Sequence, residues 1–347
     1  MKIRKPILIV LGEPNSVFIE ILSKLLNKKK IKKKINYPII IIGSKELFSS
    51  QLKILRKKLN VIDINYNLTK NINLKNKLYF INVRYRFKKP FEKISYKSKK
   101  YISLCFKIAF NYLNNGISDM LINGPVSKKN FFKNSYPGVT EYVFENSKKR
   151  IAKNPVMLIY NKKLSVSPIT THLPLKNVNK NINQKDIINN ILTINNFYRN
   201  RFNKKIKIAV LGLNPHCETN SKFNEEKKII IPAIEKLKKR KINISGPYAA
   251  DTLFITENIF KFNCVVGMYH DQVLTPFKTM FGFNASNITL GLPFLRMSVD
   301  HGPNENMLGK NQSNSDSLEN IFNFIDMIKW NFFQKSRSDK IFWIMKV

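Results

Sequence analysis

A short stretch toward the carboxyl end of the chain gathers most of the side-chain types that enzymes use for catalysis. Residues 264–302 read CVVGMYHDQVLTPFKTMFGFNASNITLGLPFLRMSVDHG. The apolar opening predicts a buried strand that ends near Tyr269, and His270, Asp271 and Gln272 follow directly. Lys278, Asn287, Arg296, Asp300 and His301 complete the set. Open α/β sheets bind their ligands at the carboxyl ends of strands, so this stretch is predicted to be a functional site.

The four histidines of the chain could include metal ligands. His172, His216, His270 and His301 each stand at or just beyond the end of a predicted strand. Neutral imidazole is the commonest metal ligand in proteins. The first three are separated by 44 and 54 residues, which matches no local zinc motif. Spacing alone therefore leaves two interpretations open, a metal site or ordinary hydrogen-bonding histidines.

The charge of the chain is strongly positive. Its 347 residues include 61 Lys and Arg against 22 Asp and Glu, a net charge of +39. Such a balance favours polyanionic partners, but the lysines are scattered along the chain and form no single basic arm. We therefore expect no specific nucleic-acid binding, although the charge would attract a phosphorylated substrate and an anionic dinucleotide.

Cysteine usage and hydropathy bear on the compartment. Cys105, Cys217 and Cys264 are odd in number and form no C-x-x-C pair, which predicts a reducing environment without a disulfide framework. No run of about eighteen apolar residues occurs, so no transmembrane helix is expected. The sequence thus predicts a cytoplasmic protein.

Predicted strands and helices alternate along the chain. In the first part, strands are expected at 6–11, 38–43, 61–66, 78–83 and 120–123, with helices at 16–27, 45–59 and 96–114. In the second part, strands are expected at 155–160, 164–169, 206–212 and 264–269, with helices at 185–198, 225–240, 251–260 and 315–332. This alternation predicts a parallel sheet covered on both faces. No G-x-G-x-x-G occurs, so a Rossmann nucleotide site is not indicated.

Further motifs precede the 264–302 stretch in a fixed order. They are INGPVSK at 122–128, GVTE at 138–141, THLPL at 171–175, LGLNPH at 211–216 and GPYAADTLF at 246–254. Together with YHDQ, NITLGLPF and SVDHG, they make the chain resemble the 4-hydroxythreonine-4-phosphate dehydrogenases of vitamin B6 biosynthesis. The resemblance extends over roughly residues 6–310.

This resemblance implies a fold and a domain arrangement. The implied fold is α/β, with two α/β/α domains and a cleft between them, as in isocitrate and isopropylmalate dehydrogenases and unlike a Rossmann fold. A discontinuous domain would comprise residues 1–124 and 285–347. The second domain, 125–284, would carry the metal ligands and the contacts of a homodimer with shared active sites.

The resemblance also assigns residues to an active site. It implies that His172, His216 and His270 bind one divalent metal (Zn, Mg or Co), with His270 supplied by the partner subunit. Asp251 and Lys278 match catalytic positions. Thr140, Lys278, Asn287 and Arg296 match substrate-binding positions, Glu218 and Asp300 match the region that binds NAD or NADP, and His301 matches a position outside the ligand set.

The implied reaction is oxidation of the secondary alcohol of 4-phosphohydroxy-L-threonine. Its β-keto acid product would lose carbon dioxide to give 3-amino-2-oxopropyl phosphate. A divalent metal suits this chemistry, because a Lewis acid stabilises an alkoxide and then an enolate. Lysine and arginine suit a phosphorylated amino acid, because both donate charge-assisted hydrogen bonds to anions.

Two departures from the family pattern leave alternatives open. Val139 stands where the family has a substrate-contacting histidine, and several loop glycines are absent, as in CETNS at 217–221. We therefore consider three hypotheses. The chain is an active dehydrogenase of this family, a related dehydrogenase for another phosphorylated hydroxy acid, or a non-catalytic basic binding protein on a decayed enzyme fold.

Overall fold

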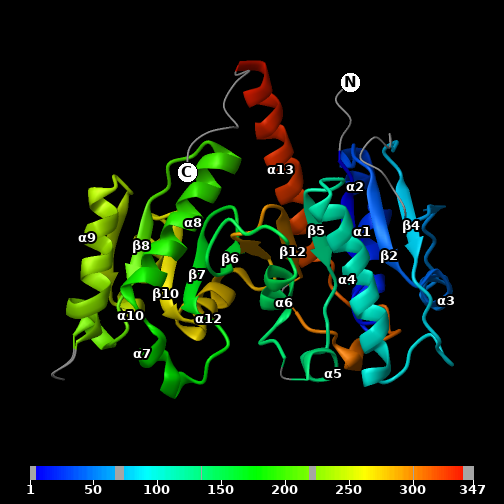
Figure 1. Ribbon diagram of the computed structural model, residues 1–347, viewed down its shortest axis with the longest axis horizontal. Helices are drawn as coiled ribbons and strands as arrows, with labels where there is room; N and C mark the ends of the chain where they lie inside the picture. Colours follow the sequence, from blue (N-terminus) through cyan, green and yellow to red (C-terminus); the bar gives the residue numbers. More distant parts are fainter. Residues whose placement is uncertain (1–4, 67–73, 134, 219–223, 300, 339–347) are drawn as a thin grey trace. The chain divides into compact units, whose positions relative to one another are not determined.

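The computed structural model describes the chain apart from residues 1–4, 67–73, 134, 219–223, 300 and 339–347, and apart from the side chains of residue 256 and of residues 329–338. The chain divides into two compact units (Figure 1). Unit 1 comprises Met1–Met157 and Phe283–Glu319, and unit 2 comprises Leu158–Gly282 and Asn320–Val347. The sequence predicts the first crossing at 124/125, whereas the units divide after Met157.

Unit 1 is built on a sheet with strand order β3-β4-β2-β1-β5-β12-β11. The strands are β1 (Ile7–Val10), β2 (Ile39–Gly43), β3 (Ile62–Asp63), β4 (Leu78–Asn82), β5 (Met120–Asn123), β11 (Ser286–Leu290) and β12 (Leu295–Ser298). The neighbours run parallel except β11, which is antiparallel to β12. The runs ILIV and IIIIG are wholly buried, as expected for parallel strands with both faces covered.

The helices of unit 1 bury their apolar faces against this sheet. They are α1 (Phe18–Asn27), α2 (Lys29–Lys34), α3 (Lys45–Ile54), η1 (Tyr96–Ser98), α4 (Lys99–Asn114), α5 (Lys128–Phe132), α6 (Val139–Glu145) and η5 (Glu305–Met307). α4 packs on β1 and β2 and contributes Ile102, Phe106 and Ala109 to a large apolar core. α3 begins after Ser44, whose hydroxyl caps the Leu47 N–H at 3.3 Å.

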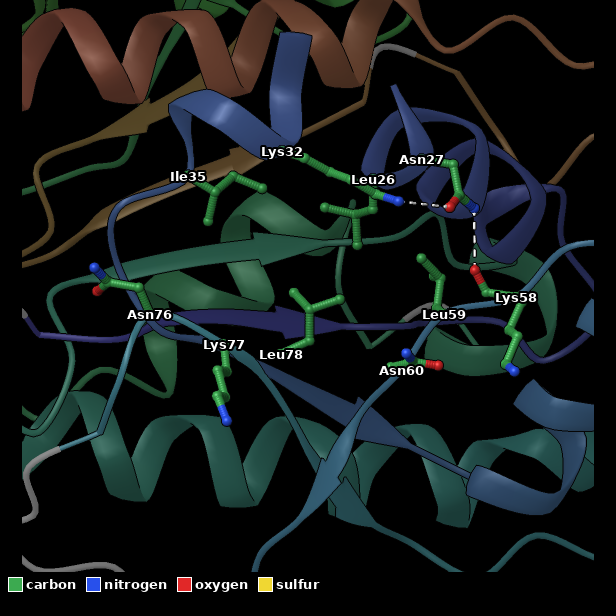
Figure 2. Close-up of a pocket in the computed structure, with 10 residues that line it drawn as sticks. All are labelled: Leu26, Asn27, Lys32, Ile35, Lys58, Leu59, Asn60, Asn76, Lys77 and Leu78. Carbon is green, nitrogen blue, oxygen red and sulfur yellow. Dashed lines mark hydrogen bonds between the residues drawn. The ribbon is translucent and has the colours of Figure 1, made fainter. Parts of the chain in front are cut away.

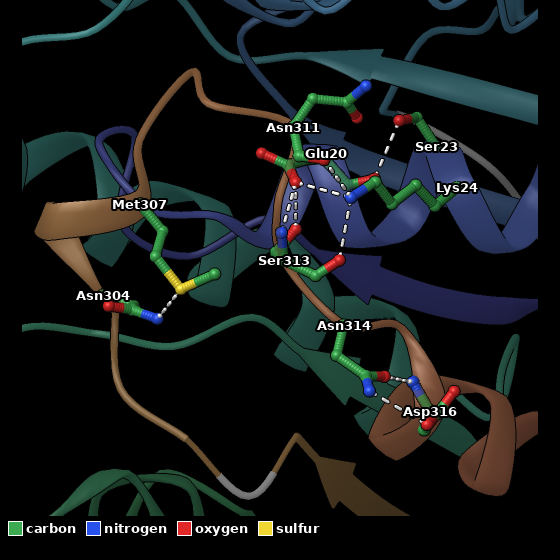
Figure 3. A network of polar contacts seen from close by, with 9 residues as sticks. All are labelled: Glu20, Ser23, Lys24, Asn304, Met307, Asn311, Ser313, Asn314 and Asp316. Atoms are coloured by element: carbon green, nitrogen blue, oxygen red, sulfur yellow. Dashed lines mark hydrogen bonds and ion pairs between the residues drawn. The ribbon is translucent and has the colours of Figure 1, made fainter.

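A buried carboxylate fastens a late segment of unit 1 to α1. Figure 3 shows Glu20 facing Ser313, which donates to it from its backbone N–H at 2.7 Å and from its hydroxyl. Lys24 donates to Glu20 at 2.9 Å and to the carbonyls of Asn311 and Ser313 at 2.8 Å. Glu20 is 2% exposed, so these donors replace the water that a buried carboxylate has lost.

Unit 2 contains a second sheet section with strand order β6-β7-β10-β8-β9. The strands are β6 (Val156–Tyr160), β7 (Ser165–Thr170), β8 (Ile208–Leu211), β9 (Ile244–Tyr248) and β10 (Cys264–Tyr269). β7, β10, β8 and β9 run parallel, and β6 is antiparallel to β7. Both units therefore pair a mainly parallel sheet with one antiparallel strand.

The helices of unit 2 vary widely in length. They are η2 (Leu175–Asn177), α7 (Val178–Asn181), α8 (Gln184–Phe202), η3 (Pro215–Cys217), the π-helix η4 (Glu226–Ile230), α9 (Ile231–Lys239), α10 (Ala250–Leu253), α11 (Thr256–Ile259), α12 (His270–Phe281) and α13 (Asp316–Ser338). α13 begins in unit 1 and continues into unit 2. α12 packs on β7 and β10 (Figure 1). No described helix has both the length and the apolar character needed to span a membrane.

Most of the predicted strands and long helices are confirmed, with three corrections. The strand predicted at 61–66 shortens to Ile62–Asp63. The helix predicted at 251–260 is two short helices. The sequence patterns do not predict α12, β9, β11 or β12. Pro276 stands inside α12, where proline normally weakens a helix, but burial of Val273, Leu274 and Phe277 offsets this.

Candidate functional site

The candidate site residues of unit 1 gather around a buried guanidinium. Arg296 lies on β12 and is 2% exposed. Its Nε donates to Asn123 Oδ1 at 2.8 Å, and one terminal nitrogen donates to the hydroxyls of Thr140 at 3.2 Å and Thr289 at 3.0 Å. These partners come from the end of β5, the start of α6 and strand β11. The structure thus brings together Arg296 and Thr140, two of the residues predicted to bind substrate.

The environment of Arg296 keeps its charge available. Burial lowers its pKa to about 10, and the nearby carboxylate of Glu141 partly opposes this. A group with this pKa still carries its proton at neutral pH. The three acceptors above are neutral oxygens that orient the guanidinium, and the nearby Glu141 carboxylate offsets part of its charge. The cluster can therefore attract and orient an anion.

Asn287 lies on β11, beside the strand that carries Arg296. Its backbone pairs with Ser298, and Thr289 pairs with Arg296 in the same antiparallel ladder. The side-chain oxygen of Asn287 is buried and has no hydrogen-bond partner among the described residues. A buried acceptor without a donor costs about 1–3 kcal/mol. A ligand hydroxyl, ammonium or amide would satisfy it.

Val139 begins α6 immediately before Thr140. It is partly buried and packs on the apolar core of unit 1, as Tyr136 and Tyr142 do. The family histidine implied at this position is therefore replaced by a side chain that joins an aromatic cluster and donates no hydrogen bond.

Two of the predicted metal ligands come together in unit 2. β7 and β10 are parallel neighbours with Tyr269 opposite Thr170. The residues that follow these two strands therefore lie side by side at the carboxyl ends of the strands. The His172 and His270 ring centroids are 6.2 Å apart, with ring planes 35° from parallel. Both line a cavity of about 330 Å³. Its other lining residues are Thr170, Thr171, Leu173, Leu175, Val178, Tyr269 and Asp271.

Asp271 contacts the His270 ring directly. His270 Nδ1 and Asp271 Oδ1 are 2.6 Å apart. A carboxylate that accepts a hydrogen bond from Nδ1–H fixes the tautomer in which Nε2 presents its lone pair. Metal-binding histidines commonly make such a hydrogen bond through the ring nitrogen that does not bind the metal. The pair is therefore chemically suited to ligation through His270 Nε2.

His216 lies in a strained turn after β8. It has φ 55° and Cys217 has φ 61°, both in the left-handed region that side chains rarely adopt. The 1%-exposed carboxylate of Glu226 holds this turn, because it accepts the N–H groups of Leu213 at 2.7 Å and Asn214 at 2.9 Å. The Asn214 side-chain amide donates to Glu226 as well.

The described residues of one chain do not assemble a complete metal site. Among them, no three His, Cys, Asp or Glu side chains lie close enough together to hold an ion. One ion between the His172 and His270 rings could bind both of them, because histidine–metal bonds are about 2.0–2.1 Å long. The donor set of one chain therefore fits a metal as a pair of ligands, and His216 does not join that pair.

Three further predicted residues, Asp251, Lys278 and Glu218, belong to unit 2. Asp251 is exposed in α10 and accepts the Thr252 N–H at 2.8 Å. Burial, followed by the carboxylates of Glu226 and Asp251, raises the pKa of Cys217, so Asp251 lies near the His216 turn. Lys278 is half-buried on α12, and Glu218 is exposed. Asp300 lies outside the described residues.

His301 is half-buried near the end of unit 1's last strand. Its Nδ1 contacts the Gly302 carbonyl at 2.9 Å, and its Nε2 is buried without a described partner. This arrangement provides no second ligating side chain in the described part of the loop.

A cavity in unit 1 does not coincide with any of these groups. It has a volume of about 510 Å³ and lies in unit 1 between α1, α2 and the start of β4 (Figure 2). Leu26 and Leu78 line its apolar side, and Lys32, Lys58 and Lys77 are at its rim. None of the predicted site residues lines it, so the chemistry of the side chains, not cavity size, marks the candidate site.

Three residues of the two clusters were not predicted as site residues. Asn123 and Thr289 orient Arg296, and Glu226 holds the His216 turn. Asn123 could have been found from its motif at the end of a predicted strand, and Thr289 from its place two residues after Asn287 on the same strand face. No local signal marks Glu226. It stands ten residues after His216, and its role depends on its contact with the turn that contains His216.

Comparisons with known proteins identify similar chains. Residues 34–325 match the family described as pyridoxal phosphate biosynthetic protein PdxA. A 4-hydroxythreonine-4-phosphate dehydrogenase of Sulfurihydrogenibium sp. is 39% identical over 310 residues, covering 87% of this chain and 92% of the relative. A crystal structure of the Klebsiella pneumoniae enzyme with that name superposes with TM-score 0.77 at 24% identity, covering 94% of this chain and 98% of the other.

A more distant structure shares the fold alone. A β-decarboxylating dehydrogenase from Thermococcus kodakarensis superposes with TM-score 0.51 at 8% identity, covering 93% of this chain and 83% of the other. The α/β fold class implied by the resemblance is confirmed.

Proposed function

The chain belongs to the pyridoxal phosphate biosynthetic protein PdxA family, and on that premise we propose that it oxidises 4-phosphohydroxy-L-threonine with NAD or NADP. The product is a β-keto acid that loses carbon dioxide to give 3-amino-2-oxopropyl phosphate, a step toward pyridoxal 5'-phosphate. The observation that carries the proposal is the buried Arg296, held by three neutral acceptors.

Charge and hydrogen bonding support this substrate class. A phosphorylated hydroxy amino acid carries a phosphate and a carboxylate, which a guanidinium recognises through charge-assisted hydrogen bonds. Thr140 supplies a hydroxyl beside Arg296, and Asn287 supplies a buried oxygen that lacks a donor. We assign the substrate anion to Arg296 and Thr140, and a substrate N–H or O–H to Asn287.

The histidine pair supports a role for a divalent cation. His172, His216 and His270 would together hold Zn, Mg or Co, with His270 supplied by the partner subunit of a homodimer. The described residues of one chain bring no three ligating side chains together, which supports a site shared between subunits. Such an ion would act as a Lewis acid toward the substrate oxygens. Asp271 holds the His270 ring in the ligating tautomer.

Proton transfer falls to residues near the histidines. We propose that Lys278 and Asp251 exchange the proton of the substrate hydroxyl, with Lys278 also contacting the substrate. Lys278 lies two turns after His270 on α12, on the same helix as a proposed metal ligand. Glu218 and Asp300 are proposed to contact the nicotinamide cofactor, and the free cysteines are consistent with a cytoplasmic enzyme.

The test is reduction of NAD by the purified protein with 4-phosphohydroxy-L-threonine, with and without an added divalent metal. We expect metal-dependent NADH formation that is lost in His216→Ala. Absence of turnover with every metal, from a folded protein, would refute the proposal.

A second candidate substrate follows from Val139. Val139 packs on the apolar core and lacks the hydrogen-bond donor that a histidine beside Thr140 would provide. This suits a related phosphorylated hydroxy acid that has a less polar group next to this residue. A panel of such acids compared with Val139→His separates the two candidates. If the variant gains more than about tenfold in kcat/KM on 4-phosphohydroxy-L-threonine and loses it on another acid, the second substrate is the native one.

A further inference from the structure

A basic cavity lies at the amino ends of the unit 1 strands. It is the cavity of about 510 Å³ drawn in Figure 2, and its volume is within the range of small-molecule sites. Lys77 and Leu78 line it from the start of β4, and Ile35 and Asn60 line it from the segments that lead into β2 and β3. The cavity therefore lies at the edge of the sheet where these strands begin.

The Arg296 cluster lies at the opposite edge of the same sheet. Arg296 Nε donates to Asn123, the last residue of β5, and the neighbouring strands β5, β1, β2 and β4 run parallel. No residue of that cluster lines the cavity. The cavity is thus separate from the proposed substrate site, and the proposed reaction does not use it.

Three ammonium groups surround the cavity. Lys32, Lys58 and Lys77 are exposed at its rim, and none of the described residues that line it is acidic. Two other cavities differ in this respect, because Asp63 lines one of about 400 Å³ and Asp271 lines the one of about 330 Å³. Three like charges around one hollow, with no carboxylate among them, give it a positive potential that attracts anions.

The lysines at the rim lack the carboxylate partner that a nearby lysine has. Lys28 pairs with Glu319 at 2.6 Å. Lys32, one turn later, donates instead to the neutral Asn27 Oδ1 at 3.2 Å, as Figure 2 shows. Within the described part of the chain, no carboxylate pairs with any of the three rim lysines. Their charges are therefore available to a ligand.

Four aliphatic side chains form the wall of the cavity. Leu26 is buried, and Ile35, Leu59 and Leu78 are half-buried, so an apolar ligand group would cover apolar surface that still meets water. Helix α1 ends at the cavity, and a helix carboxyl end contributes about half a negative charge. Three ammonium groups outweigh that contribution.

We propose that this cavity binds a phosphate monoester whose organic part is apolar. Such an ester carries a charge of about −1.5 to −2 at pH 7 and three acceptor oxygens, so it suits several lysines better than a single carboxylate does. Lysine is a common phosphate-binding residue, and the aliphatic wall receives the organic part. This goes beyond the proposed function, because it assigns a second phosphate-binding site outside the active site.

The experiment measures the binding of 1-naphthyl phosphate to the full-length protein by fluorescence anisotropy in about 150 mM NaCl, where long-range attraction is screened. We expect saturable binding. In Lys32→Gln/Lys58→Gln/Lys77→Gln, which changes only exposed side chains, the Kd should rise by at least about tenfold because three ionic contacts are lost. Inorganic phosphate should displace the probe at least about tenfold less well than unlabelled ester, because it buries no apolar surface.

Three exposed lysines of unit 2 provide a matched control. Lys204, Lys205 and Lys239 line none of the three cavities named above. Lys204→Gln/Lys205→Gln/Lys239→Gln lowers the net charge by the same amount as the rim variant, so its Kd should stay within about twofold of wild type.

Four outcomes would overturn the proposal. Absence of saturable binding would show that the cavity takes no such ester. Equal losses in the two triple variants would show diffuse attraction to a chain of net charge +39. Loss of binding in Arg296→Lys, with binding kept in the rim variant, would place the probe in the proposed substrate site. Displacement by inorganic phosphate as effective as by the ester would show that the apolar wall contributes nothing.

Discussion

The Arg296 cluster of unit 1 and the histidine pair of unit 2 represent two different ways of building a site. Arg296 is buried, and its hydrogen bonds to Asn123, Thr140 and Thr289 are all formed within the chain. His172 and His270 approach each other at the edge of a sheet, but no third ligating side chain joins them among the described residues. Under the proposed function, the first group is preorganised for its ligand, and the second needs an ion and a further ligand to become complete.

This difference has an energetic origin. A buried guanidinium must be hydrogen-bonded in the folded protein, because an unsatisfied buried charge costs several kcal/mol. The imidazoles of His172 and His270 have no such requirement, because water can hydrogen-bond to them when no ligand is bound. Perturbing the first group should therefore affect catalysis through substrate binding, and perturbing the second should act through metal content.

The largest expected effect is on the preorganised group. Arg296→Lys keeps the charge but loses the fixed fork of donors that reaches Asn123, Thr140 and Thr289 at once. We expect kcat/KM to fall by about 100-fold or more, since each charge-assisted hydrogen bond contributes about 1.5–3 kcal/mol. Steady-state NADH formation measures it. Arg150, which packs over the Phe144 ring at 5.2 Å, gives the matched control Arg150→Lys, and equal losses in both variants would contradict a special role for Arg296.

The next effect tests the incomplete group. His172→Ala removes one ring of the pair, and we expect metal affinity to fall by at least about 100-fold because a first ligand is lost. Bound metal per subunit, measured by elemental analysis after dialysis, gives the result. His301→Ala serves as the comparison, because His301 lies outside the pair. Wild-type metal content in His172→Ala would show that the pair holds no ion.

The third prediction concerns pH and a carboxyl buried in unit 1. Burial raises the pKa of Glu13 to about 7 from 4.5, although the Ser98 hydroxyl donates to it at 3.1 Å. Between these pH values the folded state holds one proton more than the unfolded state, so the free energy of unfolding falls as pH rises from about 4.5 to above 7. The loss is at most about 3.5 kcal/mol, because one pKa unit corresponds to about 1.4 kcal/mol.

Glu13→Gln should remove the contribution of Glu13 to the dependence of the unfolding free energy on pH. Urea unfolding at pH 5, 6, 7 and 8 measures it, and the variant is expected to gain stability relative to wild type as pH rises. Stability curves that stay parallel across this range would show that Glu13 ionises normally in the folded protein.

The smallest expected effect is on the turn that carries His216. Glu226→Gln keeps one oxygen that can accept the N–H groups of both Leu213 and Asn214, but it places an amide nitrogen against the Asn214 side-chain amide, which itself donates. We expect a loss of about 1–3 kcal/mol of unfolding free energy from the mismatched buried groups, measured by urea denaturation. The exposed Glu235→Gln should change it by less than about 0.5 kcal/mol. Equal effects would mean that the Glu226 bonds contribute nothing specific.

The sequence predicts the elements that carry these groups better than the groups themselves. Buried runs such as ILIV and CVVGMY predict β1 and β10 because continuous apolar character is a local property. The antiparallel strands β11 and β12 escape prediction because Asn287, Thr289 and Arg296 interrupt the apolar pattern. Thr289 and Arg296 are tolerated in buried strands because Arg296 donates hydrogen bonds to Thr289 and to Asn123.

For the candidate site, the residue types and the motif order are present in the sequence, and they lead to Arg296, Thr140 and the histidines. Which of these residues meet is decided by the order of strands. β7 and β10 become neighbours although Ser165 and its register partner Cys264 are 99 positions apart in the sequence, with β8 and β9 between them along the chain. That adjacency pairs His172 with His270, while the Glu226-held turn keeps His216 apart from them.

The sequence by itself determined the α/β alternation, the family and the set of polar residues available for chemistry. Only the tertiary structure decided that Asn123 and Thr289 orient Arg296, and that one chain brings together two of its three candidate ligands. The reason is physical. Strand and helix formation depend on neighbouring residues, whereas these contacts join residues distant in sequence whose meeting depends on how the whole sheet is ordered.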